Sequence, residues 1–244
     1  MSDTLLLVGR KHTRSVTETH AARLRDRDAA DRVRVATYDR EPAELDAGVG
    51  GEDVYVVPMT VAPDRETIQG IPGAFPSANH CEPVGTSPAV TQALTDRARE
   101  AIDSDAGIGD TTRDVSVGIV AFGDTSLSEP RGVTEQHADR LRDSGAFDTV
   151  ATAYLLQNPA AECIRYNLTG DTAVVVPFFI AGCEETDDAI PERIELDRGG
   201  ITYADPLGTH EAVTDAIESE LARARAIGGG TASVRPVATD GRGE

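Results

Sequence analysis

Short apolar runs alternate along the chain with longer stretches in which apolar and polar positions mix. The runs 5–8, 54–57 and 174–176 are almost wholly apolar, which is typical of strands buried on both faces of a parallel sheet. The stretches 15–27 and 88–102 place their less polar residues on one face at helical spacing. Strands that alternate with helices in this way predict an α/β protein whose parallel sheets are covered by helices.

The same order of elements occurs twice. Pro58 and Pro177 lie 119 residues apart, and each follows an apolar strand and precedes an apolar triplet, an acidic loop and an Ile-Pro pair. The turns at Pro83 and Pro206 lie 123 residues apart. Because strands, turns and helices recur together in one order, the chain is predicted to be a duplicated unit.

Two lobes are predicted from this repeat. The first is placed at residues 1–108 and the second at 114–227, with a linker rich in Asp, Gly and Thr between them. Residues 228–244 are rich in Gly and polar residues and are predicted to be a disordered tail. Fused copies can turn their strand ends toward each other, so a cleft is expected between the lobes.

The first helix of each half carries a histidine. Ser15, with Glu18 three residues later, has the pattern of a capping box, so the first helix is predicted to begin at Ser15. His20 lies in this helix, and His137 lies at the matching place in the second half. We interpret both histidines as packing or capping residues of the helix face rather than as metal ligands.

Acidic loops follow the two Val-Pro strands. Open parallel sheets place their chemistry at the carboxyl ends of the strands, which makes these loops the candidate site. Glu66 lies in the first loop, and Glu184 and Glu185 lie in the second. In a chain this acidic, a solvated surface is an alternative interpretation of the second loop.

Charge and composition narrow the range of partners. The chain has 42 acidic and 23 basic residues, a formal net charge of -19, and Lys11 is its single lysine. This balance repels phosphate backbones and anionic lipid, so neither nucleic acid nor membrane is expected as a partner. The composition resembles that of proteins from salt-accumulating haloarchaea, where salt screens such repulsion. An ordinary acidic soluble protein is the alternative.

Cysteine usage and hydropathy predict a cytoplasmic protein. Cys81, Cys163 and Cys183 are odd in number and have no CxxC spacing, which argues against a disulfide framework and a cysteine zinc site. The chain enters an apolar strand at Thr4 without a basic segment before it. No apolar run reaches the roughly 18 residues of a membrane span.

Three features of each half together resemble the CbiX-type sirohydrochlorin cobaltochelatases, members of the class II chelatases. They are a strand followed by Gly and a polar turn, a Val-Pro strand with an Ile-Pro loop, and a Glu/Asp-Pro-Val/Leu-Gly turn. The resemblance covers residues 4–226 and is strongest at 81–85 and 176–181. It implies two flavodoxin-like α/β lobes around a cleft that holds a tetrapyrrole.

The resemblance also implies an activity. It is the insertion of a divalent metal into sirohydrochlorin without ATP, in cobalamin biosynthesis. Co²⁺ is the expected metal, with Ni²⁺ or Fe²⁺ as alternatives; the metal is a substrate, and no organic cofactor is expected. Sirohydrochlorin is the expected partner, and another chelatase subunit is a possible one.

The family handles its metal with one histidine in the turn after the first strand and another in the loop after the Val-Pro strand. By sequence position, Arg10 and Glu66 occupy these places in the first half, and Asp124 and Glu185 in the second, so neither half keeps the pair. The expected metal ligands are Glu185, Asp124, Glu66 and Glu184. The expected catalytic residues are Glu185, Asp124 and His12. The expected substrate-binding residues are Arg10, which would pair with an acetate or propionate group, and Glu82.

The loss of both histidines raises the question of which group accepts the pyrrole protons. Imidazole suits the task because it binds divalent ions and titrates near neutral pH. A free carboxylate, with a pKa of about 4, is a poor acceptor unless neighbouring acids raise its pKa. His12 would supply a base where its side chain reaches the cleft.

Two other functions stay open. A paralogue that has lost metal insertion would serve as a tetrapyrrole or metal carrier, or as a partner subunit of an active chelatase. A small-molecule receptor of the periplasmic-binding type is disfavoured, because no export signal is visible.

Overall fold

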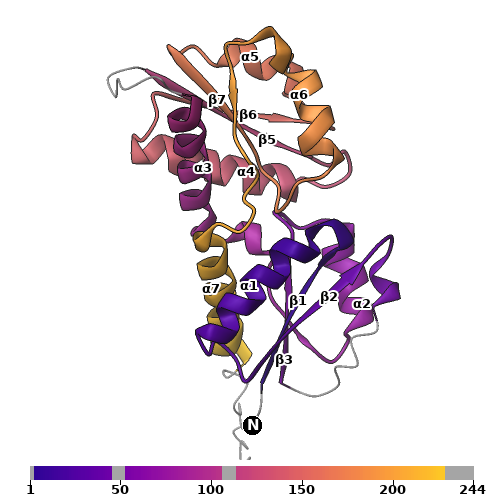
Figure 1. The fold of residues 1–244 in the computed structure, drawn as a ribbon. Coiled ribbons are helices and arrows are strands. Elements are labelled where there is room, and N and C mark those ends of the chain that lie inside the picture. Colours follow the sequence, from indigo (N-terminus) through magenta and orange to yellow (C-terminus); the bar gives the residue numbers. More distant parts are fainter. Residues whose placement is uncertain (1–2, 46–52, 106–113, 229–244) are drawn as a thin grey trace, which may run out of the picture.

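The computed structural model of the protein describes residues 3–45, 53–105 and 114–228. They form two α/β lobes, one above the other in Figure 1, and each lobe has a four-stranded parallel sheet. The predicted fold class is therefore confirmed. The predicted tail falls almost wholly outside the described residues, as does most of the predicted linker.

Each lobe has the strand order expected of one repeated unit. The first sheet is β2-β1-β3-β4, built from β1 (Thr4–Arg10), β2 (Arg32–Tyr38), β3 (Val54–Pro58) and β4 (Asn79–His80). The second sheet is β6-β5-β7-β8, built from β5 (Val115–Ala121), β6 (Thr149–Tyr154), β7 (Thr172–Pro177) and β8 (Thr202–Tyr203). The two sheets have the same topology, so each strand end in one lobe has an equivalent strand end in the other.

The helices fill the connections between these strands. They are α1 (Arg14–Asp26), α2 (Ile71–Ala74), α3 (Val90–Asp105), α4 (Glu129–Ser144), α5 (Ile164–Asn167), α6 (Ile190–Arg193) and α7 (Glu211–Gly228). In the described part of the chain no helix is long and apolar enough to cross a membrane.

The predicted capping box at the start of α1 is wrong. A 3-10 turn, Lys11–Thr13, precedes the helix, and Ser15 already lies inside it. The residue in the N-cap position is Thr13, which makes no side-chain capping bond; its hydroxyl donates to the carbonyl of Arg10 instead. Packing decides the start, since Thr13 is buried against Gly9 of β1.

The central strand β1 is buried on both faces, as its apolar run predicts. Leu5 and Leu7 pack into a core that continues into the second lobe, and Leu6 and Val8 pack into a separate cluster with Ile71. All four β1 side chains are fully buried. The strand therefore fixes its carboxyl end, where Arg10 emerges, from both sides.

The last helix of each half packs on the sheet of the other half. Helix α3 contacts β7, β8 and α4, whereas α7 contacts α1, β3 and β4. Figure 1 shows α7 beside α1 in the lower lobe and α3 beside α4 in the upper lobe. The expected ranges 1–108 and 114–227 describe the repeat along the sequence, but each packed lobe takes its last helix from the other half. We call the lobe of α1 and α7 the first lobe and the lobe of α3 and α4 the second.

Two buried histidines tie these exchanged helices in place. Nδ1 of His20 lies 2.8 Å from the hydroxyl of Thr214 on α7, and Nε2 lies 3.0 Å from the carbonyl of Gly208. His137 has the same two contacts, at 2.8 Å to Thr91 on α3 and 2.7 Å to the carbonyl of Gly85.

A carbonyl can only accept a hydrogen bond, so Nε2 carries the proton in both rings and Nδ1 accepts from the threonine. The interpretation of His20 and His137 as packing residues is confirmed, and both are fully buried. Burial lowers the pKa of each imidazole to about 4, so both rings are neutral near pH 7.

Candidate functional site

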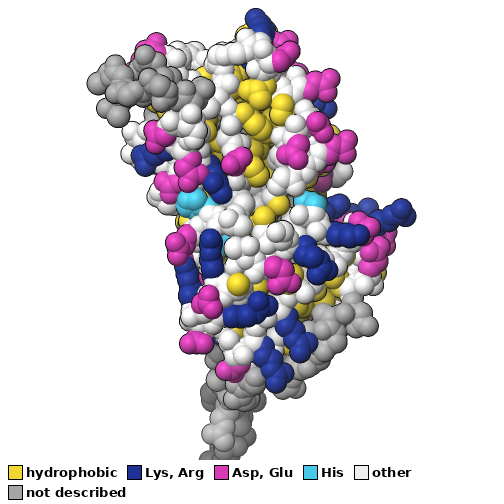
Figure 2. Space-filling model, in the orientation of Figure 1, with side chains coloured by type: hydrophobic (Ala, Val, Ile, Leu, Met, Phe, Trp, Pro, Cys, Tyr) yellow, Lys and Arg dark blue, Asp and Glu magenta, His cyan; other side chains and the backbone are white. Residues whose placement is uncertain are grey.

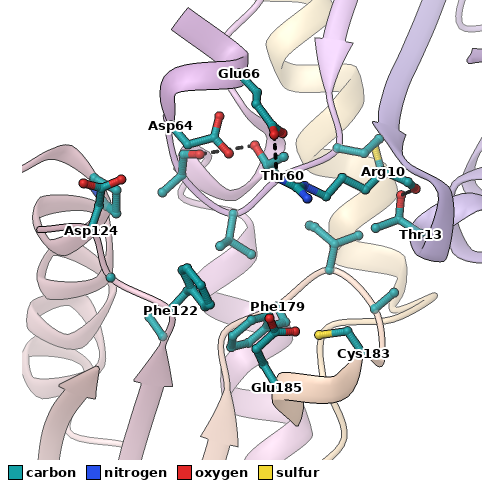
Figure 3. A pocket seen from close by; sticks show the side chains of 18 of the residues that line it. Arg10, Thr13, Thr60, Asp64, Glu66, Phe122, Asp124, Phe179, Cys183 and Glu185 are labelled. Carbon is teal, nitrogen blue, oxygen red and sulfur yellow. Dashed lines mark hydrogen bonds and ion pairs between the residues drawn. The ribbon is translucent and has the colours of Figure 1, made fainter. Parts of the chain in front are cut away.

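A cleft of about 390 Å³ lies where the carboxyl ends of the two sheets face each other (Figure 3). Its floor and walls are largely apolar, from Met59, Val61 and Ala62 of the first lobe and Phe122, Phe179 and Ile180 of the second. The charged side chains that line it are Arg10, Asp64, Arg65, Glu66, Asp124 and Glu185, together with His12. An apolar cavity with a few polar groups at its edge is the usual form of a small-molecule site.

The two Val-Pro strands position their acidic loops in the same way. Beyond Pro58 and Pro177 the chain runs into a π-helical turn that begins at Glu66 in the first lobe and at Glu185 in the second. A threonine fastens each turn: Thr67 bonds to the backbone of Asp64, and Thr186 bonds to the backbone of Cys183. Glu66 and Glu185 are therefore equivalent, as the sequence repeat predicted.

In the first lobe, three side chains form a closed hydrogen-bonded group. Nη2 of Arg10 donates to Oε1 of Glu66 at 2.5 Å, and the hydroxyl of Tyr38 donates to Oε2 at 2.7 Å. Both carboxylate oxygens of Glu66 are thus engaged. Burial, and then the hydrogen bond and the charge of Glu66, raise the pKa of Tyr38. Burial alone would lower the pKa of Arg10, but the charges of Glu66, Tyr38 and Asp64 and the hydrogen bond to Glu66 together outweigh it, and the pKa is raised.

The equivalent of Arg10 in the second lobe is Phe122, and the predicted equivalence with Asp124 is wrong. Val8 of β1 pairs with Pro58, and Val120 of β5 pairs with Pro177, so the positions two residues later correspond. The glycines that suggested the match are not equivalent, since Gly9 lies within β1 whereas Gly123 lies beyond β5 with φ of 78°.

The same register places Leu155 where the first lobe has Tyr38. Arg10 pairs with Tyr38 across β1 and β2, and Ala121, one position before Phe122, pairs with Tyr154 across β5 and β6. Leu155 is buried and carries no hydroxyl. The second lobe thus lacks both the cation and the phenol that engage the acidic residue of the first.

Asp124 lies in the cleft and shapes its own turn. Its Oδ1 accepts the backbone N–H groups of Ser126 and Leu127, at 2.6 and 2.9 Å, and its carbonyl accepts from Gln157. Oδ2 has no hydrogen bond to another described residue. Figure 3 shows Asp124 apart from Glu185, beyond Phe122.

Glu185, unlike its equivalent Glu66, forms no ion pair with a described residue. No Lys, Arg or His in the described ranges forms an ion pair with it, and its neighbour is the thiol of Cys183. Burial, followed by the hydrogen bond to Glu185, raises the pKa of that thiol, so the sulfur is protonated at neutral pH. The two side chains lie together in Figure 3, beside Phe179.

His12 reaches the cleft from the first lobe. It lines the cavity, and the charge of Glu185, from the opposite lobe, acts on it. Burial lowers the pKa of His12, Arg10 lowers it further, and Glu185 opposes both. The imidazole is therefore neutral at pH 7 and can accept a proton.

Two predicted site residues lie outside the cleft. Glu184 is exposed at the start of the π-helical turn and does not line the cavity. Glu82 is exposed beside Arg223 of α7, away from the cavity lining. Within residues 3–45, 53–105 and 114–228 no group of three or more His, Cys, Asp and Glu side chains is close enough together to hold a metal ion.

The sequence prediction missed four residues of the site. Phe122 and Phe179 supply its aromatic wall, Arg65 adds a second cation, and Tyr38 orients Glu66. The sequence carried a signal for Phe122, because this aromatic residue directly follows the apolar strand that becomes β5. In the fold its side chain is 43% exposed, at the cleft. The sequence carried no signal for Tyr38, since its role depends on the pairing of β1 with β2.

Comparisons with known proteins agree with this geometry. The CbiX family model matches residues 120–224. The chain is 24% identical to a probable sirohydrochlorin cobaltochelatase of Halobacterium salinarum, over 89% of this chain and 88% of that protein.

Two solved structures share the fold. SirB from Bacillus subtilis, solved with Fe3+, matches with a TM-score of 0.73 at 15% identity, over 95% of this chain and 98% of SirB. A multi-domain Deinococcus radiodurans protein with structural similarity to chelatases matches with a TM-score of 0.71 at 18% identity. That match covers 91% of this chain but only 55% of the longer protein.

The family model covers the cleft wall of the second lobe, and the structural matches cover both lobes. The resemblance to the CbiX-type chelatases is therefore confirmed: the chain shares the two-lobe fold of SirB, and its residues 120–224 match the CbiX family model.

Proposed function

We propose that the protein inserts a divalent metal into sirohydrochlorin, with Co²⁺ as the first candidate and Ni²⁺ or Fe²⁺ as alternatives, and that it serves cobalamin biosynthesis. The observation that carries the proposal is the pair formed by Glu185 and His12. They face one apolar cleft from opposite lobes, one as a carboxylate without a cation and the other as a neutral base. The likeness to the Halobacterium salinarum relative supports cobalt.

In this proposal the second lobe presents the metal. Glu185 is the principal protein ligand, and Oδ2 of Asp124 is a second one reached during transfer. Carboxylates bind divalent ions without strong selectivity, and so small a ligand set binds them weakly. Weak binding suits a chelatase, because the metal has to leave the protein for the nitrogens of the ring.

The pyrrole N–H protons leave as the metal enters. His12 accepts such a proton on its free imidazole nitrogen and passes it to solvent, because its side chain is exposed at the cleft edge. Phe122 and Phe179 cover a face of the planar ring and exclude water from the metal. No ATP is required, since the ring binds the metal more tightly than the protein does.

An absorption assay tests the proposal directly. Purified full-length protein in molar KCl is mixed with sirohydrochlorin and Co²⁺, and the spectral change of metal insertion is followed against a protein-free control. The proposal expects a rate proportional to protein concentration. A rate equal to that of the control, with Co²⁺, Ni²⁺ and Fe²⁺ in turn, would exclude the chelatase function.

A second candidate is a non-catalytic paralogue that carries the tetrapyrrole or the metal, or that assists another chelatase subunit. The observation in its favour is the absence of the family histidine pair from both half-sites, with Arg10 and Glu66 paired to each other instead. The carrier predicts thermal stabilisation by sirohydrochlorin without any acceleration of metal insertion. Turnover in the assay above would reject it.

We also propose that the protein works in a high-salt cytoplasm. Its net charge of -19 would destabilise the compact state through self-repulsion at low ionic strength. Raising KCl to about 1 M shortens the Debye length to about 3 Å and removes most of this repulsion. The midpoint of thermal unfolding should therefore rise with KCl, and a flat or falling dependence would contradict the proposal.

A further inference from the structure

The cleft is polarised between its two lobes. The first lobe contributes both cations, Arg10 and Arg65, together with Asp64 and Glu66, whereas the charged residues of the second lobe are the acids Asp124 and Glu185. Nine of the 23 Lys and Arg residues of the chain fall between residues 10 and 40. On the face shown in Figure 2, dark blue side chains gather over the first lobe, and magenta ones predominate over the second.

This polarity bears on how an anionic ring could enter so acidic a protein. A net charge of -19 repels a ligand that carries several carboxylates. An apolar cleft would accept the ring faces but not the charged edge, because an unpaired buried carboxylate is costly. The ring edge therefore needs a cation, and the cleft offers Arg10 and Arg65 on the first-lobe side.

We propose that Arg10 is the anchor for a peripheral carboxylate of the ring, and that Glu66 and Tyr38 hold its guanidinium in place for this task. This inference rests on the proposed function and names the part of the substrate that the first lobe recognises. The ligand class is a planar ring with free carboxylate side chains. Its orientation then presents the ring nitrogens to Glu185 of the second lobe.

The geometry of Arg10 leaves it free to bind a ligand carboxylate, because its ion pair with Glu66 does not use all of its N–H groups. A guanidinium has five N–H donors, and among the described residues Arg10 gives one of its own to Glu66. Its side chain is 45% exposed, so further donors face the cleft. The planar fork of arginine can bind a second carboxylate on another edge while it keeps the bond to Glu66.

Glu66 and Tyr38 act as positioning residues. The side chain of Glu66 is 22% exposed, and Tyr38 is buried. The carboxylate of Glu66, which accepts from Arg10, is therefore itself held by the hydrogen bond from Tyr38. An arginine with ordered rotamers loses less entropy when a carboxylate binds. The second lobe, with Phe122 and Leu155 at the equivalent positions, has no such device.

The test measures binding before turnover. Metal-free sirohydrochlorin is titrated into full-length protein in molar KCl, and Kd is read from the absorbance change. Arg10→Gln should raise Kd at least about tenfold, because hydrogen bonds to charged groups are the strong ones. The matched control is Arg32→Gln, which removes the same charge from the same lobe at the far end of β2 and should leave Kd within about twofold. Thermal unfolding verifies that each variant is folded.

A second comparison tests the recognised group. Uroporphyrin, which carries carboxylates on every pyrrole, should bind more tightly than its methyl ester, and Arg10→Gln should shrink that preference. Glu66→Gln keeps an acceptor but removes the charge that holds the guanidinium of Arg10 in place, so it should raise Kd, by less than Arg10→Gln does. In steady-state assays Arg10→Gln should raise KM and leave kcat within about threefold, since the anchor contributes binding that ground state and transition state share.

The outcomes separate this inference from the proposed function. Wild-type turnover together with an unchanged Kd for Arg10→Gln would overturn the anchor and leave the chelatase function standing. A fall in kcat at constant KM would overturn it as well, because Arg10 would then act in the chemical step. A wild-type protein that binds neither sirohydrochlorin nor uroporphyrin would overturn both.

Discussion

The two lobes share a backbone plan but differ in chemistry at two of three equivalent positions. The first half-site holds Arg10, Tyr38 and Glu66, and the second holds Phe122, Leu155 and Glu185. The glutamate is common to both and begins a π-helical turn in each. In the first half-site it is paired with a cation and accepts a hydrogen bond from a phenol, and in the second it has neither partner.

This difference shows how a duplicated fold can divide one task between its copies. The backbone needs only to bring three strand ends together, which the repeated register does in both lobes. Replacing two side chains then decides whether the remaining carboxylate is engaged in an ion pair or open to a metal. We therefore propose that the metal binds at the second half-site and the anionic edge of the ring at the first.

Removing the two glutamates in turn gives the largest expected contrast. Glu185→Ala should lower the rate of metal insertion at least about a hundredfold, or about 2.7 kcal/mol, because the principal ligand is lost. Metal insertion is measured by absorbance at saturating sirohydrochlorin. Glu66→Ala is the matched variant at the equivalent position and should change kcat by less than about threefold. Equal losses in both variants, or the reverse order, would contradict the division of labour.

The histidine ties provide a comparison in which the lobes should behave alike. His20 and His137 have pKa values of about 4 in the folded protein and would titrate near 6.5 when unfolded. Because the two imidazoles are harder to protonate in the folded protein, their contribution to the free energy of unfolding is complete above pH 6.5 and is lost as the pH falls toward 4. At pH 5 each should cost about 2 kcal/mol relative to neutral pH.

Chemical denaturation at pH 7.5 and pH 5 measures this loss. Arg23 and His210 face His20, and Arg140 faces His137, and all three disfavour protonation of the ring. His20→Gln and His137→Gln should each reduce the pH dependence by a similar amount. If the stability of the double variant still falls between pH 7.5 and pH 5, the loss comes from other groups and not from the two histidines.

Giving the second half-site the cation of the first should weaken its binding of Co²⁺. Phe122→Arg places a guanidinium where the first lobe has Arg10, and Phe122 is exposed enough to accept the change. The new cation should pair with Glu185 and reduce the apparent affinity for Co²⁺ about tenfold, or about 1.4 kcal/mol. The dependence of the rate on Co²⁺ concentration measures it. Phe122→Leu, which adds no charge, is the control and should keep the wild-type metal dependence.

The smallest expected effect concerns the thiol beside Glu185. Cys183→Ser keeps a hydrogen-bond donor for Glu185 and removes the sulfur. Because burial and Glu185 raise the pKa of the thiol, it is protonated and a poor ligand at neutral pH. Metal insertion should therefore change by less than about threefold. A tenfold loss specific to Co²⁺ would make the sulfur a ligand and would enlarge the second half-site.

The repeat made much of the fold predictable. Buried strands such as β1 are continuous apolar runs in the sequence because both of their faces are covered. Glu66 and Glu185 lie as far apart as Pro58 and Pro177 do, so the repeat predicted correctly that the two glutamates are equivalent. The equivalence of Arg10 with Asp124 failed because glycine was used as a marker of the strand end. Only hydrogen-bonded register shows that Gly9 lies inside a strand and that Gly123 lies beyond one.

The candidate site was predictable in position and only partly in composition. Glu185, Asp124, His12, Glu66 and Arg10 all line the cleft, since each follows a strand whose carboxyl end faces the other lobe. Glu82 follows β4 but turns toward α7, which the exchange of helices brings beside it. Its place could not be predicted, because α7 comes from the other half of the sequence.

The sequence by itself determined the duplicated α/β plan, the strands and the acidic surface, because these depend on residue type and local periodicity. The tertiary structure decided which helix covers which sheet and which glutamate is neutralised. Those outcomes depend on contacts between residues far apart in the chain, such as Arg10 with Glu66 and His20 with Thr214. Two units with the same order of elements could pack their helices either way, and only the energy of the whole arrangement distinguishes the two packings.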